Sequence, residues 1–266
     1  MTMIDTVNRR FKADVHARKP LLGAFVKTPH PIVVEVMAGA GYDFLVLDCE
    51  HAPFDRGTLD TLIFTGRALG CAMVVRVPVG SPDWLLFVLD AGAAGVMVPH
   101  VNTVPQAETL AQAMRYGPGG RGFAGTTRAA HYADRSMTEH MARTPQETVL
   151  IAQIEDPEGA ENVAGIAAVA GVDALFVGRA DLAVGYGIND FHAERIGTIT
   201  REVLGQQAAA TGLYCAPGED LSGFAEAGGS LFVIGSEHSA IRAFASDSRA
   251  LLNTAASAPE TQSPHP

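Results

Sequence analysis

The chain alternates short runs that are almost entirely apolar with longer segments whose apolar residues recur at helical spacing. Runs of the first kind are typical of strands in a parallel sheet that is covered on both faces. Segments of the second kind, such as residues 58–69, indicate amphipathic helices. The pattern predicts eight strands, over residues 21–26, 44–48, 73–76, 95–98, 149–152, 174–177, 213–216 and 230–234.

Helices are predicted before, between and after these strands. Residues 3–17 are polar and weakly amphipathic, which predicts a leading helix outside the repeating pattern. Ser81-Pro82-Asp83 places a capping hydroxyl before a proline at the first helical position, and Thr103 with Gln106 resembles a capping box. Further helices are predicted over residues 32–39, 58–69 and 191–210, between residues 155 and 174, as a short helix after residue 216, and as a closing helix to about residue 252.

The alternation of strands and helices predicts an α/β fold, a closed (β/α)8 or TIM barrel with a leading N-terminal helix. A length of 266 residues is about that of one such barrel, so a single domain is expected over residues 1–253. Residues 254–266 are small, polar and rich in proline, which predicts a disordered tail. Residues 116–148 interrupt the alternation with a glycine-rich loop and a polar, helical excursion, and loops of this length are usually functional or lie between subunits.

The composition argues against several partners and chemistries. A formal charge of −10 argues against nucleic acid or an anionic membrane as partner, because their phosphates would repel the chain. No apolar run approaches the length of a membrane span. The chain has three lysines, Lys12, Lys19 and Lys27, so amine chemistry on a central or late strand is excluded.

The cysteines indicate the cellular compartment. Cys49, Cys71 and Cys215 lie in or beside strand-like runs, and none of them forms a C-x-x-C pair. This pattern favours reduced, buried thiols over disulfides or a zinc site. Because the basic N-terminal segment is not followed by an apolar leader, we expect a cytoplasmic protein.

Catalytic residues of such barrels lie where the strands end and the following loops begin. Two neighbouring strands deliver Glu155 and Asp181 to this rim, and paired carboxylates are a good site for a hard divalent cation. The alternative is that both are exposed acids at loop starts, which is the commonest position of Asp and Glu. The other polar residues at strand ends are Asp48, Glu50, His51, Arg76, His100, Gln153 and Ser236.

Several motifs in order along the chain resemble the HpcH/HpaI aldolase family, the metal-dependent class II pyruvate aldolases that cleave 4-hydroxy-2-oxo acids. The resemblance covers nearly the whole chain from Gly23 to Ile234 and implies a (β/α)8 barrel, usually assembled as a hexamer by exchange of the last helix. The motifs that carry it are Asp48-x-Glu50-His51-Ala52-Pro53, Val75-Arg76, Leu89-Asp90-x-Gly92, Val98-Pro99, Arg115-Tyr116 with Arg121-Gly122, Gln153-Ile154-Glu155, and Gly178-x-Ala180-Asp181-Leu182.

The resemblance also implies a substrate and a cofactor. Glu155 and Asp181 would hold a divalent cation, Mg2+ or Mn2+, although Co2+ or Zn2+ would fit the same oxygens. A 2-oxo acid would complete the coordination through its carboxylate and keto oxygen. Gln153 and the backbone N–H groups of Ala180 and Asp181 would hold the substrate carboxylate, and Arg76 would lie over the keto oxygen.

The remaining roles concern proton transfer. The resemblance makes His51 the general base for the C4 hydroxyl, oriented by Asp90 from the same or an adjacent subunit. Asp48 and Glu50 would hold water bound to the metal. Taken singly, each residue has a simpler role, as a surface arginine, a solvated acid or a structural histidine. The co-occurrence of all of them at one rim favours the catalytic roles.

Two positions depart from the family pattern, and other functions remain open. Arg179 stands where proline is common, and it would contact a substrate acid or a neighbouring loop; His100 is expected to be a specificity or packing residue. The alternatives are an acyl-CoA lyase of the citrate-lyase β type and a non-catalytic barrel that binds an oxo acid. The acceptor aldehyde would be set by residues 27–30, residues 117–132 and loops of neighbouring subunits, and the residues there do not identify it.

Overall fold

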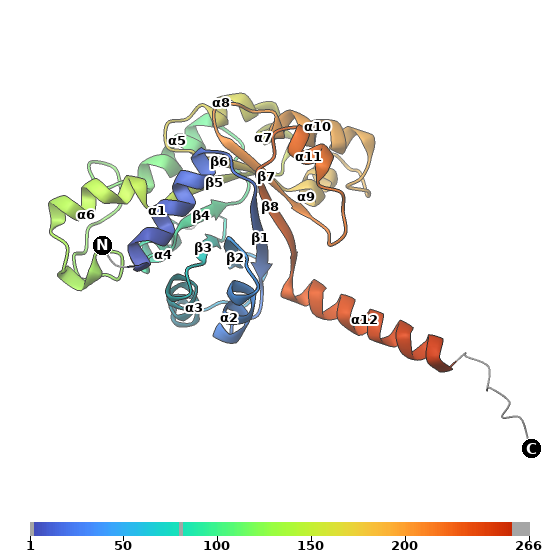
Figure 1. Cartoon of the computed structure of the whole chain (residues 1–266). Helices are drawn as coiled ribbons and strands as arrows, with labels where there is room; N and C mark the ends of the chain where they lie inside the picture. The colour runs from blue at the N-terminus through green and yellow to red at the C-terminus, as the bar shows by residue number, and fades with distance from the viewer. Residues whose placement is uncertain (1–2, 80–81, 257–266) are drawn as a thin grey trace, which may run out of the picture.

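The computed structural model describes residues 3–79 and 82–256, which form a closed barrel of eight parallel strands in sequence order (Figure 1). This confirms the predicted barrel. The register places the ends of adjacent strands side by side, as for Asp48 beside Arg76. The strands are β1 Leu21–Val26, β2 Phe44–Asp48, β3 Ala72–Arg76, β4 Gly95–Val98, β5 Val149–Ile154, β6 Ala174–Val177, β7 Ala210–Cys215 and β8 Leu231–Ser236.

Helices follow the strands and cover the barrel, as the apolar periodicity predicts. The capping box at Thr103 is present with both of its hydrogen bonds, whereas the cap predicted at Ser81 lies outside the described residues. The helices are α1 Met3–His16, α2 Pro31–Gly39, α3 Arg56–Ala68, α4 Pro82–Asp90, α5 Val104–Ala113, α6 Met137–Arg143, α7 Pro157–Glu161, α8 Val163–Ala167, α9 Arg179–Gly185, α10 Glu194–Leu204, α11 Ser222–Glu226 and α12 Glu237–Ala256.

Several predicted boundaries are wrong, among them that of the strand expected over residues 213–216, which is β7 and spans Ala210–Cys215. The helix expected over residues 191–210 is the shorter α10, because the chain already enters β7 at Ala210. Strand β8 continues through Ser236, two residues further than expected. Residues 254–256 belong to α12 and not to a disordered tail, while the rest of that tail lies outside the described residues.

The core has two layers. One lies between the strands and the surrounding helices, and the other fills the barrel with side chains such as Phe44, Met97 and Phe176. Helix α1 closes one end of this interior, where the ring of Phe11 lies 5.4 Å from that of Phe44. The leading helix thus seals the barrel at the end opposite the carboxyl ends of the strands. Those carboxyl ends, where catalytic residues of this fold lie, remain free for a site.

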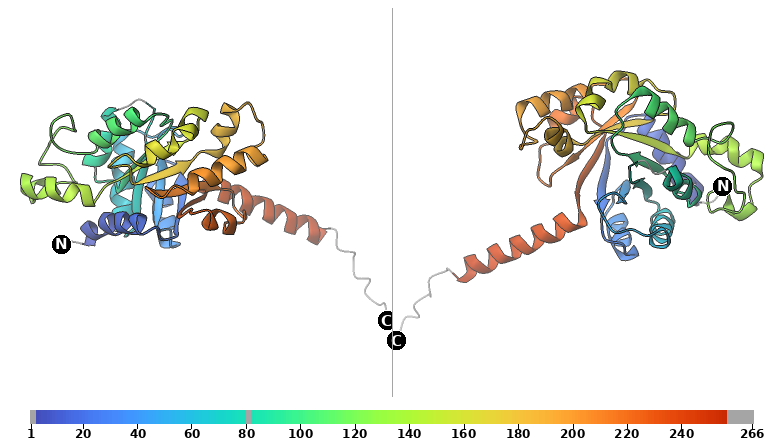
Figure 2. Two further views of the ribbon diagram at one scale, coloured as in Figure 1. Left: turned by 90° about the horizontal axis from the view of Figure 1, so that it is seen from above. Right: turned by 180° about the vertical axis from the view of Figure 1, so that it is seen from behind.

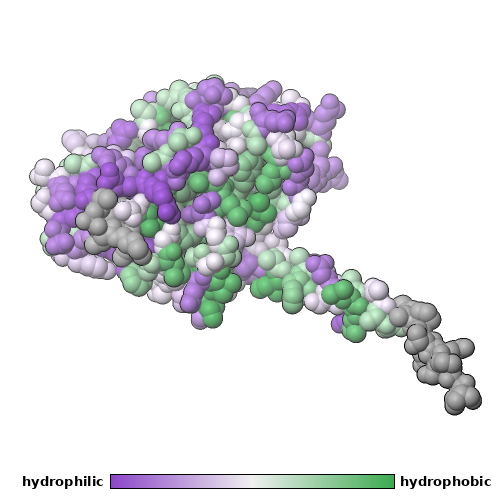
Figure 3. All heavy atoms as spheres, in the orientation of Figure 1, coloured by the Kyte–Doolittle hydropathy of each residue, from purple (hydrophilic) through white to green (hydrophobic). Residues whose placement is uncertain are grey.

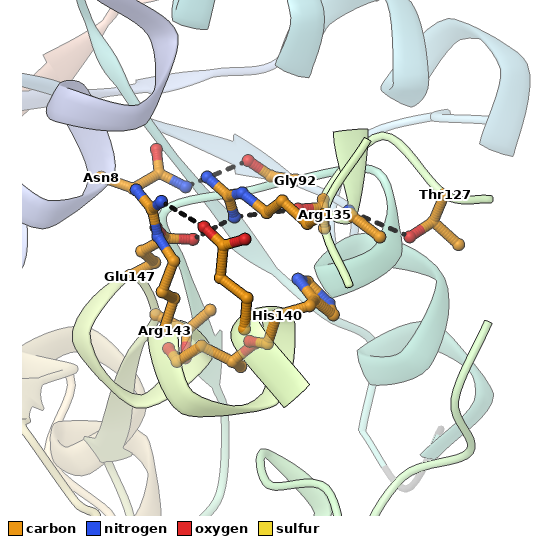
Figure 4. Close-up of polar contacts among 12 residues, drawn as sticks. Asn8, Gly92, Thr127, Arg135, His140, Arg143 and Glu147 are labelled. Atoms are coloured by element: carbon orange, nitrogen blue, oxygen red, sulfur yellow. Dashed lines mark hydrogen bonds and ion pairs between the residues drawn. The ribbon is translucent and has the colours of Figure 1, made fainter. Parts of the chain in front are cut away.

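The excursion over residues 116–148 packs beside α1 (Figure 4). Its chain includes α6 and two short 3-10 helices, η1 His131–Ala133 and η2 Thr144–Gln146. Glu147 joins Arg135, at 3.0 Å, to Arg143, at 3.2 Å, while Asn8 of α1 donates to the carbonyl of Gly92 at 3.2 Å. The Glu147 pairs hold the excursion together internally. Other hydrogen bonds join it to the rest of the chain, among them one from Ala129 N–H to the Asp90 carbonyl at 3.1 Å and one from Lys12 Nζ to the Thr148 carbonyl at 2.7 Å.

Helix α12 projects away from the barrel instead of packing on it (Figures 1 and 2). Of its side chains, that of Glu237 is buried, and the following residues are largely exposed. Exposed apolar side chains along it include Ile241, Phe244 and Leu251. Figure 3 shows apolar residues both along α12 and on the nearby part of the barrel.

Two further expectations concern the cysteines and membrane segments. Cys49, Cys71 and Cys215 are free and buried, as expected, and burial raises the pKa of each thiol to about 12. They are therefore inert neutral thiols at physiological pH. Within residues 3–79 and 82–256, no helix has the length and apolar character needed to cross a membrane.

Candidate active site

A pocket of about 270 Å³ lies at the carboxyl ends of the strands. It brings together residues that are far apart in the sequence. Predicted site residues His51, Arg76, Gln153 and Asp181 all line it. Its full lining is Phe25, Lys27, His51, Arg76, Gln153, Phe176, Gly178, Arg179, Ala180, Asp181, Phe191, Tyr214 and Ser236.

The acidic side of the pocket is built by the ends of β5 and β6. Glu155 is 1% exposed, and its carboxylate accepts hydrogen bonds from the backbone N–H of His100, at 2.9 Å, and from the amide of Gln153. Gly178 follows β6, and a Cβ there would lie 2.6 Å from Glu155. A glycine is therefore required for the two strand ends to approach each other around this carboxylate.

The electrostatics of this side favour a cation. Burial, with a smaller contribution from the charge of Asp181, raises the pKa of Glu155 to about 7 against the hydrogen bonds and the His100 charge that lower it. Among the described residues, no lysine or arginine forms an ion pair with either acid. Oε1 of the buried Gln153 likewise has no hydrogen-bond partner in the described part of the chain. The imidazole of His100 lies 3.6 Å from Glu155 Oε1, and two acids that lack a lysine or arginine partner fit a divalent ion.

The protein supplies few ligands for such an ion. Within the described residues, no group of three or more His, Cys, Asp or Glu side chains is arranged to bind a metal. The two carboxylates would therefore need further oxygen ligands from a substrate and from water. Two carboxylates suit a hard cation that keeps coordination positions open for substrate and water.

The opposite side of the pocket is built around the buried Asp48. Its Oδ1 accepts from Arg76 Nη2 at 2.8 Å and Nε at 3.0 Å, and Glu50 lies 3.3 Å from the third guanidinium nitrogen. Burial alone would raise the pKa of Asp48, but the hydrogen bond and charge of Arg76 outweigh it and lower the pKa. Asp48 and Glu50 thus fix the Arg76 guanidinium, which also stacks over Phe25 at 4.6 Å. Their expected contact with metal-bound water remains a prediction.

His51 and Asp90 do not meet within one chain. His51 lines the pocket with a side chain 57% exposed, and its backbone N–H donates to Asp48 at 3.2 Å. Asp90 ends α4, where Arg121 lies 3.4 Å from its carboxylate. No contact joins His51 to Asp90 among the described residues. The expected pairing of these two residues stays a prediction.

The two departures from the family pattern have structural partners. Arg179 makes a two-pronged pair with Glu219, at 2.7 and 2.8 Å, and donates to the Tyr214 carbonyl. It therefore contacts a neighbouring loop, which is one of the two expectations for it. His100 holds Glu155 through its backbone, while its ring lies 2.8 Å from Asp156.

The pocket residues Lys27 and Tyr214 were given no individual role by the sequence reasoning, although residues 27–30 were expected to help set the acceptor aldehyde. Lys27 follows β1 and points into the pocket, and Tyr214 of β7 lies in its wall. The rule that located the other polar residues, a position at a strand end, also applies to Lys27. Tyr214 lies inside a strand, one residue before its end at Cys215, and the surrounding sequence does not indicate that its side chain faces the pocket.

The fold and this rim define an α/β-barrel enzyme whose active site lies at the carboxyl ends of the strands. A family model described as HpcH/HpaI aldolase/citrate lyase matches residues 21–243. The chain belongs to the HpcH/HpaI aldolase/citrate lyase family. It is therefore a carbon–carbon lyase.

Three relatives illustrate the similarity. The chain is 38% identical over 179 residues to a hydroxypyruvate/pyruvate aldolase of Roseovarius nubinhibens, covering 66% of this chain and 69% of that protein. It is 36% identical over 184 residues to a 5-keto-4-deoxy-D-glucarate aldolase of Escherichia coli, and the match covers 69% of this chain and 71% of that protein. A solved structure of a family member from Burkholderia cenocepacia matches with a TM-score of 0.83 at 31% identity, covering 92% of this chain and 99% of that one.

Proposed function

We propose that the protein catalyses reversible, metal-dependent aldol cleavage of a 4-hydroxy-2-oxo acid to pyruvate, or a related 2-oxo acid, and an aldehyde. The observation that carries the proposal is the pocket in which Asp181 lies with the arginine Arg76 and the base His51. The buried Glu155 lies behind this lining, close enough to Asp181 for the two charges to interact. The names of the aldolase relatives support pyruvate or hydroxypyruvate as the 2-oxo acid.

Glu155 and Asp181 are the residues that would hold the cation, for which we favour Mg2+ or Mn2+ over Co2+ or Zn2+. When bound, such a cation supplies positive charge beside the keto oxygen of the substrate, where negative charge develops during cleavage. Gln153 and the backbone N–H groups of Ala180 and Asp181 hold the substrate carboxylate. Those N–H groups lie in the first turn of α9, where helix geometry leaves them without an intrahelical acceptor.

The remaining side chains carry out the bond cleavage. His51 accepts the proton of the C4 hydroxyl, the C3–C4 bond breaks, and the hydroxyl carbon becomes the aldehyde carbonyl. The electron pair of the broken bond passes to the 2-oxo acid as its enolate. Arg76, held by Asp48 and Glu50, donates to the oxygen on which this charge collects. Protonation of the enolate at C3 then completes the reaction.

Assembly would complete this site. In a (β/α)8 barrel the last helix normally joins the outer ring, but α12 projects and leaves Leu22 of β1 and Ile32 and Val36 of α2 exposed. The exposed apolar residues of α12 match this uncovered surface in character. We therefore include in the proposal an exchange of α12 between copies in a hexamer, which would also bring Asp90 of one subunit to His51 of the next.

The proposal is tested by aldol addition. The protein is stripped with a chelator, reloaded with Mn2+ or Mg2+, and incubated with pyruvate and a panel of simple aldehydes. A new hydroxy-oxo acid should form with metal and not without it, and His51→Ala should abolish its formation. An absence of metal-dependent product with every aldehyde, or full activity of His51→Ala, would contradict the proposal.

A further inference from the structure

The chain places a lysine in the pocket that neither the cation site nor the proton transfer uses. Lys27 follows β1, which lies opposite β5 in the closed order of the barrel. The acids that anchor the 2-oxo acid follow β5 and β6. Lys27 is therefore across the pocket from β5, and both its ammonium group and the backbone N–H of His51 contact Asp48.

The lysine differs from the two arginines of the pocket in its partners. The guanidinium of Arg76 is held by two carboxylates, those of Asp48 and Glu50, and its remaining N–H groups serve the substrate oxygen in the proposed mechanism, while Arg179 is matched by Glu219. Within residues 3–79 and 82–256, Lys27 has one ionic contact, in which its Nζ lies 3.3 Å from Asp48 Oδ2. An ammonium group has three N–H donors, so donors remain for a ligand.

The position of this lysine is fixed from the backbone. The carboxylate of Glu237, at the start of α12, accepts hydrogen bonds from the N–H groups of Lys27, at 2.8 Å, and Thr28, at 2.6 Å. Asp48 holds the other end of the side chain, which is 31% exposed. The ammonium is thus pre-positioned at the pocket wall, which reduces the entropy that it loses when it binds a ligand.

We propose that Lys27 is a specificity-determining residue that binds a negatively charged group, carboxylate or phosphate, on the acceptor aldehyde. This assignment rests on the proposed aldolase function and adds the chemical class of its second substrate. The 2-oxo acid is held at the β5 and β6 side, the new bond forms near His51, and the distal end of the acceptor extends to Lys27. A neutral acceptor gains no ionic contact there.

The test compares matched aldehydes in the metal-loaded, full-length protein. Succinic semialdehyde is paired with butanal, and glyceraldehyde 3-phosphate with glyceraldehyde, so that the two arms distinguish a carboxylate from a phosphate. The variants are Lys27→Met, which keeps the aliphatic stem, and Lys27→Arg, which keeps the charge. Lys19→Met is the control, because Lys19 is exposed and pairs with Asp14 away from the pocket.

Lys27→Met should lower kcat/KM for the charged member of one pair at least about tenfold and change the neutral member less than about twofold. Lys27→Arg should recover part of the loss, and Lys19→Met should resemble the wild type. Exchange of the pyruvate methyl protons for deuterium should continue in Lys27→Met, because that step needs no acceptor.

Three results would overturn the assignment. They are equal losses with charged and neutral acceptors, no loss with either, and a folded Lys27→Met protein that has also lost deuterium exchange. If Lys27→Met does not fold, a wild type that shows no preference for the charged member of either pair overturns it as well. A wild type without metal-dependent exchange would instead contradict the aldolase function itself.

Discussion

Replacing Asp48 by asparagine should destabilise the protein and disable the site together. Asp48 is fully buried, and its carboxylate contacts Arg76, Lys27 and the backbone N–H of His51. Asparagine keeps the shape but removes the charge that compensates two cations. Breaking a buried ion pair costs about 3–5 kcal/mol, and because Glu50 still faces Arg76 we expect about 3 kcal/mol. For a chain of this length that lowers Tm by roughly 6–12 °C.

The assay is thermal and urea unfolding of Asp48→Asn beside the control Asp43→Asn. Asp43 precedes the same strand but is exposed, and its side chain accepts one hydrogen bond, from the N–H of Leu22. Its replacement should cost less than about 1 kcal/mol. The aldol activity of Asp48→Asn should fall because the Arg76 guanidinium loses its main partner.

The pH dependence supplies a second check on Asp48. The pKa of Asp48 is lower in the folded protein than in the unfolded chain, so its ionised form stabilises the fold at any pH above the ordinary aspartate pKa of about 4. This stabilisation is lost as the pH falls through the folded pKa. The stability of Asp48→Asn should therefore fall less steeply in acid than that of the wild type. Equal stability of Asp48→Asn and wild type at pH 7 would refute the role assigned to this carboxylate.

Three further changes test other parts of the structure. Gly178→Ala places a Cβ 2.6 Å from Glu155 and should weaken Mn2+ binding roughly tenfold by calorimetry, whereas Gly223→Ala, with open space around it, should not. Burial lowers the pKa of His140 to about 4, so as the pH falls below about 6.5 this histidine is protonated in the unfolded chain before it is protonated in the folded one. The free energy of unfolding measured with urea should therefore fall by about 3 kcal/mol by pH 4, and His140→Gln should remove this loss. Phe244→Asp on exposed α12 should reduce the molar mass measured by light scattering, and an unchanged mass would argue against helix exchange.

The strands were predictable because a parallel sheet covered on both faces needs unbroken apolar runs. Strand β7 was placed too late because it begins with small residues that give little apolar signal. At Gly212 in this strand a Cβ would lie 2.2 Å from the Leu231 carbonyl oxygen, so close strand packing explains the small residue there. Such a requirement depends on the neighbouring strand and cannot be read locally.

The site was predictable to the extent that strand ends converge on one rim. His51, Arg76, Gln153 and Asp181 were placed in the pocket by that rule. Which side chains pair there could not be predicted, because the pairs join residues from different strands and loops. The contact of Arg179 with Glu219 is one example, since these residues are 40 positions apart in the chain. The direction of α12 is another, because amphipathicity alone does not say against which surface the apolar face of a helix packs.

The central claim is that Glu155 and Asp181 together hold a divalent cation that promotes loss of a proton from C3 of a 2-oxo acid. It is tested most directly by NMR, from the exchange of pyruvate methyl protons in D2O with chelator-treated protein before and after addition of Mg2+. We expect exchange that depends on the added metal and is lost in both Glu155→Gln and Asp181→Asn. Exchange that persists after chelation, or that survives in the two variants, would contradict the claim.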